Sequence, residues 1–249
     1  MALLIALALS ELIPFEIAAY LTRHFEGVIS NWFNILPSTA CYYFLSALCH
    51  RFIQFVIVLV IFKFWFKKPL SDLGLNFNNK TKSLHIIKWV VIIWPILVIL
   101  FFFISTIGIP DFSNYITAQY PVQGSLKYAL ILRDTLLLDA FAEETLYRGL
   151  IFTVLAFAWQ ETFQFKGKTY KFVTLLSVPF FVLSHISLSV IPFEVFYYDP
   201  VQLALTTFTG ILFAAIYDQT NSLFAPIVVH GYTNFIITIL GLLTSFILT

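Results

Sequence analysis

Charged side chains are scarce in this 249-residue chain. Asp, Glu, Lys and Arg make up 11% of it, whereas a soluble domain carries about 25%. The formal net charge is only +1, so the sequence gives no reason to expect a nucleic-acid partner. Hydrophobic residues reach 60%, and the mean hydropathy is +0.90. The apolar runs are near 20 residues long rather than ten-residue alternations, which predicts a helical integral membrane protein.

Cysteine and metal-binding patterns are also sparse. The two cysteines, Cys41 and Cys49, fall in one predicted helix and would lie about 12 Å apart along its axis, too far for a disulfide within that helix. No Cys/His spacing typical of zinc is present. No internal repeat or extramembrane domain stands out. We predict a single membrane domain over residues 1–249, with N-terminal helices in 1–110 and core helices in 124–248.

The predicted fold class is all-α: a polytopic membrane protein with about six to eight transmembrane helices, four of which form a core in the second half. The first run carries two acids, Glu11 and Glu16, and lacks the basic region of a signal peptide. The apolar runs cover residues 2–21, 38–65, 84–107, 127–160, 172–191, 201–217 and 223–248.

Basic residues alternate between the connectors. The 63–88 and 166–171 regions hold nine lysines, and the 108–126 and 192–200 regions hold no Lys or Arg. The positive-inside rule therefore predicts that the lysine-rich connectors face the cytoplasm. The N-terminus would then also be cytoplasmic if the first run crosses the bilayer.

A pair of acids, Glu143 and Glu144, interrupts the run 127–160 near its middle. In a continuous helix Glu143 would lie roughly 24 Å from either end, and a charge at such a depth marks a functional site by default. Glu144 and Arg148 have the i, i+4 spacing of a helical ion pair. Glu143 has no such partner on its own helix, so we expect one acid to be neutralised and the other to stay unpaired for chemistry. A buried ion-pair cluster that only fixes helix register is the alternative.

Other polar residues interrupt the apolar runs. Arg51 falls in the middle of the run 38–65 and needs a partner or water, for which Glu11 and Glu16 are the hypothesis. His185 is expected well inside the run 172–191, where a lone histidine is usually structural. His230 and Asn234 share one face of the last helix, where they could hold an oxyanion or bond between helices.

Taken together, these residue types fit peptide hydrolysis. The reaction requires a base for the attacking water, a group that orients the water, and donors for the developing oxyanion. The chain contains no Gly-x-Ser-x-Gly nucleophile and no His-Glu-x-x-His zinc motif.

Three ordered motifs carry a family resemblance: Glu143-Glu-x-x-x-Arg148, Phe181-x-x-x-His185 and His230-x-x-x-Asn234. Over residues 126–240 the chain resembles the CAAX protease and bacteriocin-processing (CPBP, or Abi) family of intramembrane glutamate endopeptidases.

The resemblance implies that Glu143 and His185 activate a water, and that His230 and Asn234 form the oxyanion hole. Glu144 and Arg148 would then be the supporting ion pair, with Phe181 beside them.

The resemblance also implies a bilayer-embedded enzyme that cleaves a membrane-embedded or membrane-adjacent peptide without a metal or other cofactor. Two Glu and two His could still bind a metal, so this alternative stays open. The short, Phe-rich chain looks like a bacterial member, which implies a bacterial cell membrane. The substrate, its lipidation and the oligomeric state stay open.

Two other functions remain open. One is a non-catalytic immunity or scaffold protein of the same fold, and the other is a small carrier that uses the buried acids as a proton relay. One geometric problem is also open. His230 lies only about 12 Å beyond Ser222, shallower than Glu143 and His185, so either the 218–222 turn sits in a water-filled cavity or the predicted span ends are wrong.

Overall fold

The computed structural model describes residue 17, residues 20–21, residues 38–190 and residues 193–249. Most of the first apolar run, with Glu11 and Glu16, lies outside the described residues, and so does Arg23. The expectations that fall there, namely the first span and the pairing of Arg51 with Glu11 or Glu16, are not tested.

The predicted all-α polytopic fold is confirmed. The helices before the acid pair are α2 (Ser38–Val60), η1 (Ile61–Trp65), η2 (Leu70–Leu73), α3 (Lys80–Gly108), α4 (Phe112–Gln119) and α5 (Leu126–Thr135). Those that follow are α6 (Leu138–Glu144), η3 (Thr145–Phe152), α7 (Thr153–Ala158), α8 (Val173–Leu176), α9 (Val178–Leu183), α10 (Pro200–Thr220) and α11 (Phe224–Leu248). Four stretches in the described part are long and apolar enough to cross a membrane: Tyr43–Trp65, Lys80–Gly108, Pro200–Thr220 and Phe224–Leu248.

The run that carries the acid pair is segmented, not one continuous helix as predicted. It breaks between α5 and α6, where Leu137 has a left-handed backbone (φ 56°). After Glu144 it continues as the π-helix η3, a form that is frequent at functional sites. Gly231 on α11 leaves room for the Leu137 side chain at this break, because a Cβ at position 231 would stand 2.1 Å from Leu137 Cδ2. The break therefore packs directly on the helix that carries His230.

The predicted helix over residues 172–191 is also wrong in its second half. It is helical as α8 and α9 and ends at Leu183. The chain then forms an antiparallel hairpin of β3 (Ser187–Val190) and β4 (Phe193–Tyr197) before α10 begins. A second hairpin, β1 (Thr162–Phe165) with β2 (Lys168–Lys171), forms the lysine-bearing connector.

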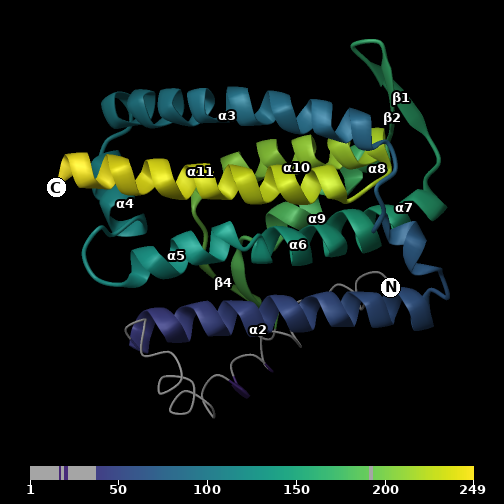
Figure 1. Ribbon diagram of the computed structural model, residues 1–249, viewed down its shortest axis with the longest axis horizontal. Helices are drawn as coiled ribbons and strands as arrows, with labels where there is room; N and C mark the ends of the chain where they lie inside the picture. Colours follow the sequence, from purple (N-terminus) through teal and green to yellow (C-terminus); the bar gives the residue numbers. More distant parts are fainter. Residues whose placement is uncertain (1–16, 18–19, 22–37, 191–192) are drawn as a thin grey trace.

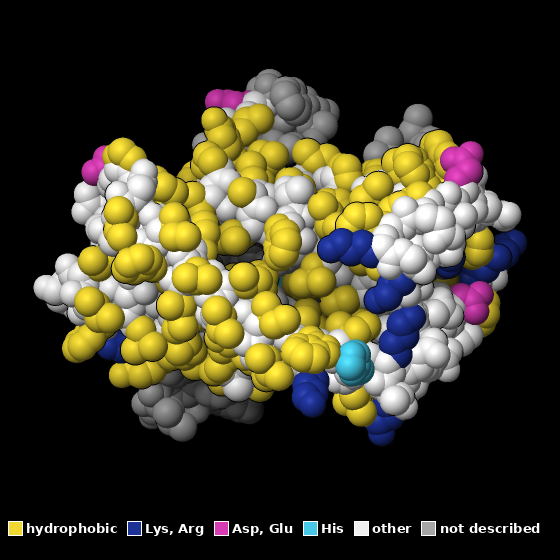
Figure 2. Space-filling model, turned by 90° about the horizontal axis from the view of Figure 1, so that it is seen from above, with side chains coloured by type: hydrophobic (Ala, Val, Ile, Leu, Met, Phe, Trp, Pro, Cys, Tyr) yellow, Lys and Arg dark blue, Asp and Glu magenta, His cyan; other side chains and the backbone are white. Residues whose placement is uncertain are grey.

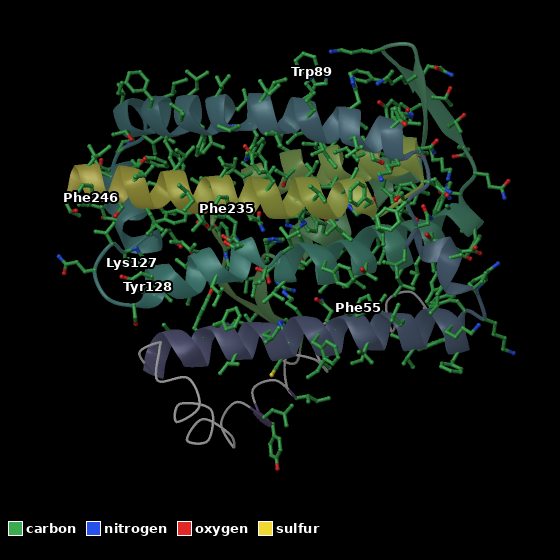
Figure 3. The ribbon with its side chains drawn as sticks, viewed as in Figure 1. Phe55, Trp89, Lys127, Tyr128, Phe235 and Phe246 are labelled. Carbon is green, nitrogen blue, oxygen red and sulfur yellow. The ribbon has the colours of Figure 1, made fainter. Side chains whose placement is uncertain are left out.

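The helices lie roughly side by side, with α11 between α3 and the α5–α6 segment (Figure 1). On the far side of α5–α6 lies α2, whose Phe55 ring packs against Phe141 with centroids 4.8 Å apart (Figure 3). The β1–β2 hairpin and the 221–223 turn lie at one end of the bundle, and the C-terminus lies at the other (Figure 1). The site residues can therefore come from α2, α6, α9 and α11.

The turn between α10 and α11 packs against the connector before α3, with Ser222 and Leu223 buried and Asn221 exposed. Ser222 donates to the Asn76 carbonyl, Asn79 donates to the Thr220 carbonyl at 2.9 Å, and the Leu223 amide donates to the Gly74 carbonyl at 2.8 Å. The connector before α3 thus satisfies the polar backbone of the turn, as buried backbone groups require. His230, on the helix that follows, lies beside Glu144, with its Nδ1 2.8 Å from Glu144 Oε1, so the predicted difference in depth does not separate the two side chains.

Candidate active site

The four residues predicted to carry the chemistry, Glu143, His185, His230 and Asn234, line one cavity of about 390 Å³. Phe181 lines it as well. The other lining residues are Arg51, Tyr115, Gln119, Tyr120, Arg133, Asp139, Tyr197, Asp199, Gln202, Leu205, Thr206, Thr209, Ile237 and Thr238. Three sequence segments that are distant along the chain therefore meet at one polar cavity inside the helical bundle.

Glu143 is paired, which corrects the expectation of an acid kept unpaired. Its Oε1 accepts a hydrogen bond from Arg51 Nη2 at 2.5 Å, and its Oε2 lies 3.8 Å from His230 Nε2. Its side chain is 9% exposed. Arg51 comes from α2, 92 residues earlier, and the i, i+4 rule covers only partners on the same helix. One carboxylate oxygen is thus held by an arginine and the other faces the cavity and the imidazole.

A series of alternating charges extends from Glu143 along α5 and α6. Arg51 also donates to Asp139 at 2.7 Å, and the second oxygen of Asp139 lies 3.1 Å from Arg133 Nε. Arg133 also donates to Asp134 at 2.9 Å. Every charge in this series has an opposite charge beside it, as buried ions require.

Glu144 is fully buried and bridges two helices. The ion pair predicted from its spacing is present, with Arg148 Nε 3.2 Å from Glu144 Oε2. That approach is a charge contact and lacks hydrogen-bond geometry. The other oxygen of Glu144 bonds His230 Nδ1 at 2.8 Å. Arg148 donates to the Gly210 carbonyl and stacks over the Phe181 ring, 4.4 Å from its centroid. Glu144 therefore fixes the orientation of the His230 ring.

His185 lies in the turn after α9, not within a helix as predicted. Its Nδ1 bonds the Phe181 carbonyl oxygen at 2.9 Å. A carbonyl oxygen only accepts, so Nδ1 carries the proton and the neutral ring has its lone pair on Nε2. The Phe181 backbone therefore holds His185 in the tautomer that a proton acceptor needs.

Asn234 lies one turn after His230 on the same face of α11 and lines the same cavity. Within the described residues its side-chain amide makes no hydrogen bond to protein. Asn234 can therefore donate to a group in the cavity.

Three charged residues of the site had no role assigned from the sequence: Arg133, Asp139 and Asp199. Arg133 and Asp139 could have been found, because a charge inside an apolar run is a functional candidate by default, whereas Asp199 lies in the 192–200 connector and gave no such signal. Asp199 caps α10 by accepting from the Val201 amide at 2.8 Å, and it also accepts from the Tyr115 hydroxyl at 2.6 Å. Burial and the neighbouring Asp199 carboxylate raise the pKa of Tyr115 above its ordinary value, so this hydroxyl stays protonated and keeps its hydrogen bond.

In the described part of the chain, no group of three His, Cys, Asp or Glu side chains is arranged as metal ligands. The absence of a metal cofactor stays a prediction.

Residues 125–236 match the protein-family model described as Type II CAAX prenyl endopeptidase Rce1-like. Comparison with curated proteins and with solved structures gave no significant match. The matched segment begins just before α5, ends within α11 and contains all three motifs. The family resemblance predicted from the motifs is confirmed: residues 125–236 of this integral membrane protein are similar to the Rce1-like type II CAAX prenyl endopeptidase family.

Proposed function

We propose that this protein is an intramembrane endopeptidase that hydrolyses a peptide bond in a membrane-embedded or membrane-adjacent peptide, with a water activated by Glu143 and His185. The observation that carries the proposal is the shared cavity: one carboxylate, two imidazoles and an amide from three segments line the same space. The family match over residues 125–236 supports a protease, and the geometry supports this assignment of roles.

His185 is the proposed proton acceptor. Its Nδ1 is committed to the Phe181 carbonyl, so Nε2 takes the proton as the water oxygen attacks the scissile carbonyl carbon. The same proton then passes to the leaving amine when the carbon–nitrogen bond breaks. Glu143, held by Arg51 through one oxygen, orients the water with the other oxygen.

His230 and Asn234 are the proposed donors to the oxyanion. An ionised Glu144 only accepts, so His230 donates to it from Nδ1. His230 can then donate from Nε2 to an oxyanion only as the imidazolium. The Glu143 carboxylate lies beside its Nε2, and the Glu144 carboxylate lies beside its Nδ1.

The test is comparative peptidomics of membranes from cells that express the wild type or Glu143→Gln. We expect peptides that depend on the wild type and disappear in Glu143→Gln, while both proteins insert equally. Glu161→Gln is the matched control, because Glu161 is exposed on the connector after α7, and it should cleave like the wild type. Full cleavage by Glu143→Gln would sink the proposal.

The second candidate is a non-catalytic immunity or scaffold protein of the same fold. The dense pairing of Arg51, Arg133 and Arg148 with acids favours it, because such a network can serve structure alone. Cells protected equally well by the wild type and by Glu143→Gln would support this candidate.

A further inference from the structure

The two proposed oxyanion donors, His230 and Asn234, lie on one short stretch of α11. Glu144 holds the His230 ring through a hydrogen bond of 2.8 Å. The Asn234 side-chain amide makes no hydrogen bond to protein within the described residues, so the α11 backbone alone sets where this amide lies. Displacing a catalytic group by about 1 Å can cost about 100-fold in rate. Contacts that fix the α11 backbone beside Asn234 therefore bear directly on catalysis.

Two hydrogen bonds attach this stretch of α11 to α3. Trp94 Nε1 donates to the Thr233 carbonyl at 3.3 Å, and the Tyr232 hydroxyl donates to the Val91 carbonyl at 3.0 Å. Both bonds reach α11 between the two oxyanion donors. The α5–α6 segment lies on the other side of α11 (Figure 1). This stretch of α11 is thus held from two sides.

Pro95 gives the Tyr232 hydroxyl its acceptor. A proline within a helix has no N–H, so the carbonyl four residues earlier loses its helical partner. In α3 that carbonyl belongs to Val91. The face of the molecule that carries α3 is mostly hydrophobic (Figure 2), and within a bilayer a backbone group freed by proline must be satisfied by protein. The Tyr232 hydroxyl does this, which fixes α11 at a point where a regular helix would offer no free carbonyl.

Trp94 is held at its ring as well as at its nitrogen. Its side chain is buried, and its ring stacks on Phe208 of α10 with centroids 6.3 Å apart and an interplanar angle of 13°. A buried indole N–H needs an acceptor, and the Thr233 carbonyl supplies it. Thr233 directly precedes Asn234 and is itself buried. Trp94 therefore connects α3 and α10 to the backbone next to the amide.

We propose that Tyr232 and Trp94 are positioning residues for Asn234, so that α3 belongs to the catalytic unit. The inference rests on the proposed function and adds two residues to its machinery. The described lining of the cavity includes neither side chain, so both act through the α11 backbone. Val91, Trp94 and Pro95 precede residue 125, where the family match begins, so the match covers only the α11 half of these contacts.

Thermal unfolding in detergent tests the contact without any cleavage. Tyr232→Phe removes only the hydroxyl and should lower the Tm by about 2–12 °C, because the Val91 carbonyl loses its partner. Pro95→Ala supplies the missing N–H. In a Pro95→Ala background, Tyr232→Phe should therefore lower the Tm by less than about 2 °C. Equal losses in the two backgrounds would overturn the proposal.

Cleavage tests the positioning. The readout is the rate at which folded protein forms a product peptide that the comparison of wild type and Glu143→Gln identifies. Tyr232→Phe and Trp94→Phe should each lower kcat about tenfold or more and leave KM unchanged, because an oxyanion donor acts in the transition state. Trp89→Phe is the matched control. The Trp89 indole also donates, to His85 at 3.1 Å, but on the exposed face of α3, so this variant should cleave like the wild type.

A purely structural role is separated by an Asn234→Ala background. There Tyr232→Phe should lower kcat no more than about twofold further, because the donor that it positions is already gone. A further tenfold loss would show that the hydroxyl acts elsewhere and would overturn the proposal. If the wild type forms no product, the proposed hydrolysis is wrong and the positioning role falls with it. Product that depends on Glu143 but not on the Tyr232 hydroxyl overturns the positioning role alone.

Discussion

Replacing Arg51 with methionine tests the link between α2 and the acid pair. Arg51 binds Asp139 at 2.7 Å and Glu143 at 2.5 Å, and its side chain is 19% exposed. Removing one partner of a buried ion pair costs about 3–5 kcal/mol, and the water-accessible cavity places the expected cost near the lower limit. At about 2–4 °C per kcal/mol for a chain of this size, a loss of about 3 kcal/mol lowers the Tm by about 6–12 °C.

The assay is thermal unfolding in detergent at one fixed scan rate, on Arg51→Met, Glu143→Gln and the double variant. Arg51→Met leaves the Glu143 carboxylate without its arginine partner, and Glu143→Gln removes that charge. The double variant should therefore be more stable than the sum of the two single losses predicts. Contacting pairs couple by about 0.5–3 kcal/mol. Strictly additive losses would refute the pairing. Lys88→Met, on the exposed face of α3, is the control and should change stability by no more than about 0.5 kcal/mol.

Three further predictions concern packing around the site. Glu144→Gln should lower the free energy of unfolding by about 3–5 kcal/mol, because the fully buried Arg148 would lose its charged partner. A Tm in detergent equal to that of the wild type would contradict this. Gly149→Ala should lower the free energy of unfolding by about 1–3 kcal/mol, because its Cβ would stand 3.0 Å from the Leu73 side chain. An unchanged free energy of unfolding in chemical denaturation would show that Leu73 moves aside at no cost and would contradict the prediction. Asp199→Ala should lower the free energy of unfolding by about 0.5–2 kcal/mol, because α10 loses its cap. If the helix content of the variant and of the wild type falls in the same way on heating, the prediction is wrong.

Gly108→Ala is the control for Gly149→Ala. Nothing lies within 4 Å of the Cβ that it would add at the end of α3, so its Tm should match that of the wild type or rise slightly.

Local spacing predicted the parts of the site that depend on a single helix. The pairing of Glu144 with Arg148 and the shared face of His230 and Asn234 follow from the helical period, and both are present. The lysine-rich and lysine-free connectors could also be identified from the sequence, because composition alone defines them.

The contacts that join distant segments could not be predicted. Arg51 was expected to need a partner, but Asp139 and Glu143 lie 88 and 92 residues away, and no local rule selects them over other acids. The placement of His185 failed for a different reason. The apolar run continues past it, and hydrophobicity alone does not distinguish a helix from the β3–β4 hairpin that follows Leu183.

The position of Arg51 has a consequence for how the chain is made. During synthesis α2 enters the bilayer before Asp139 exists, since that residue follows 88 positions later. At about 5–20 residues per second, translation of that interval takes roughly 4–18 s. For that time the Arg51 guanidinium lacks the Asp139 and Glu143 carboxylates that bind it in the folded bundle, and these contacts form only when α6 arrives. Biogenesis of this protein therefore depends on the order in which its helices insert and pack.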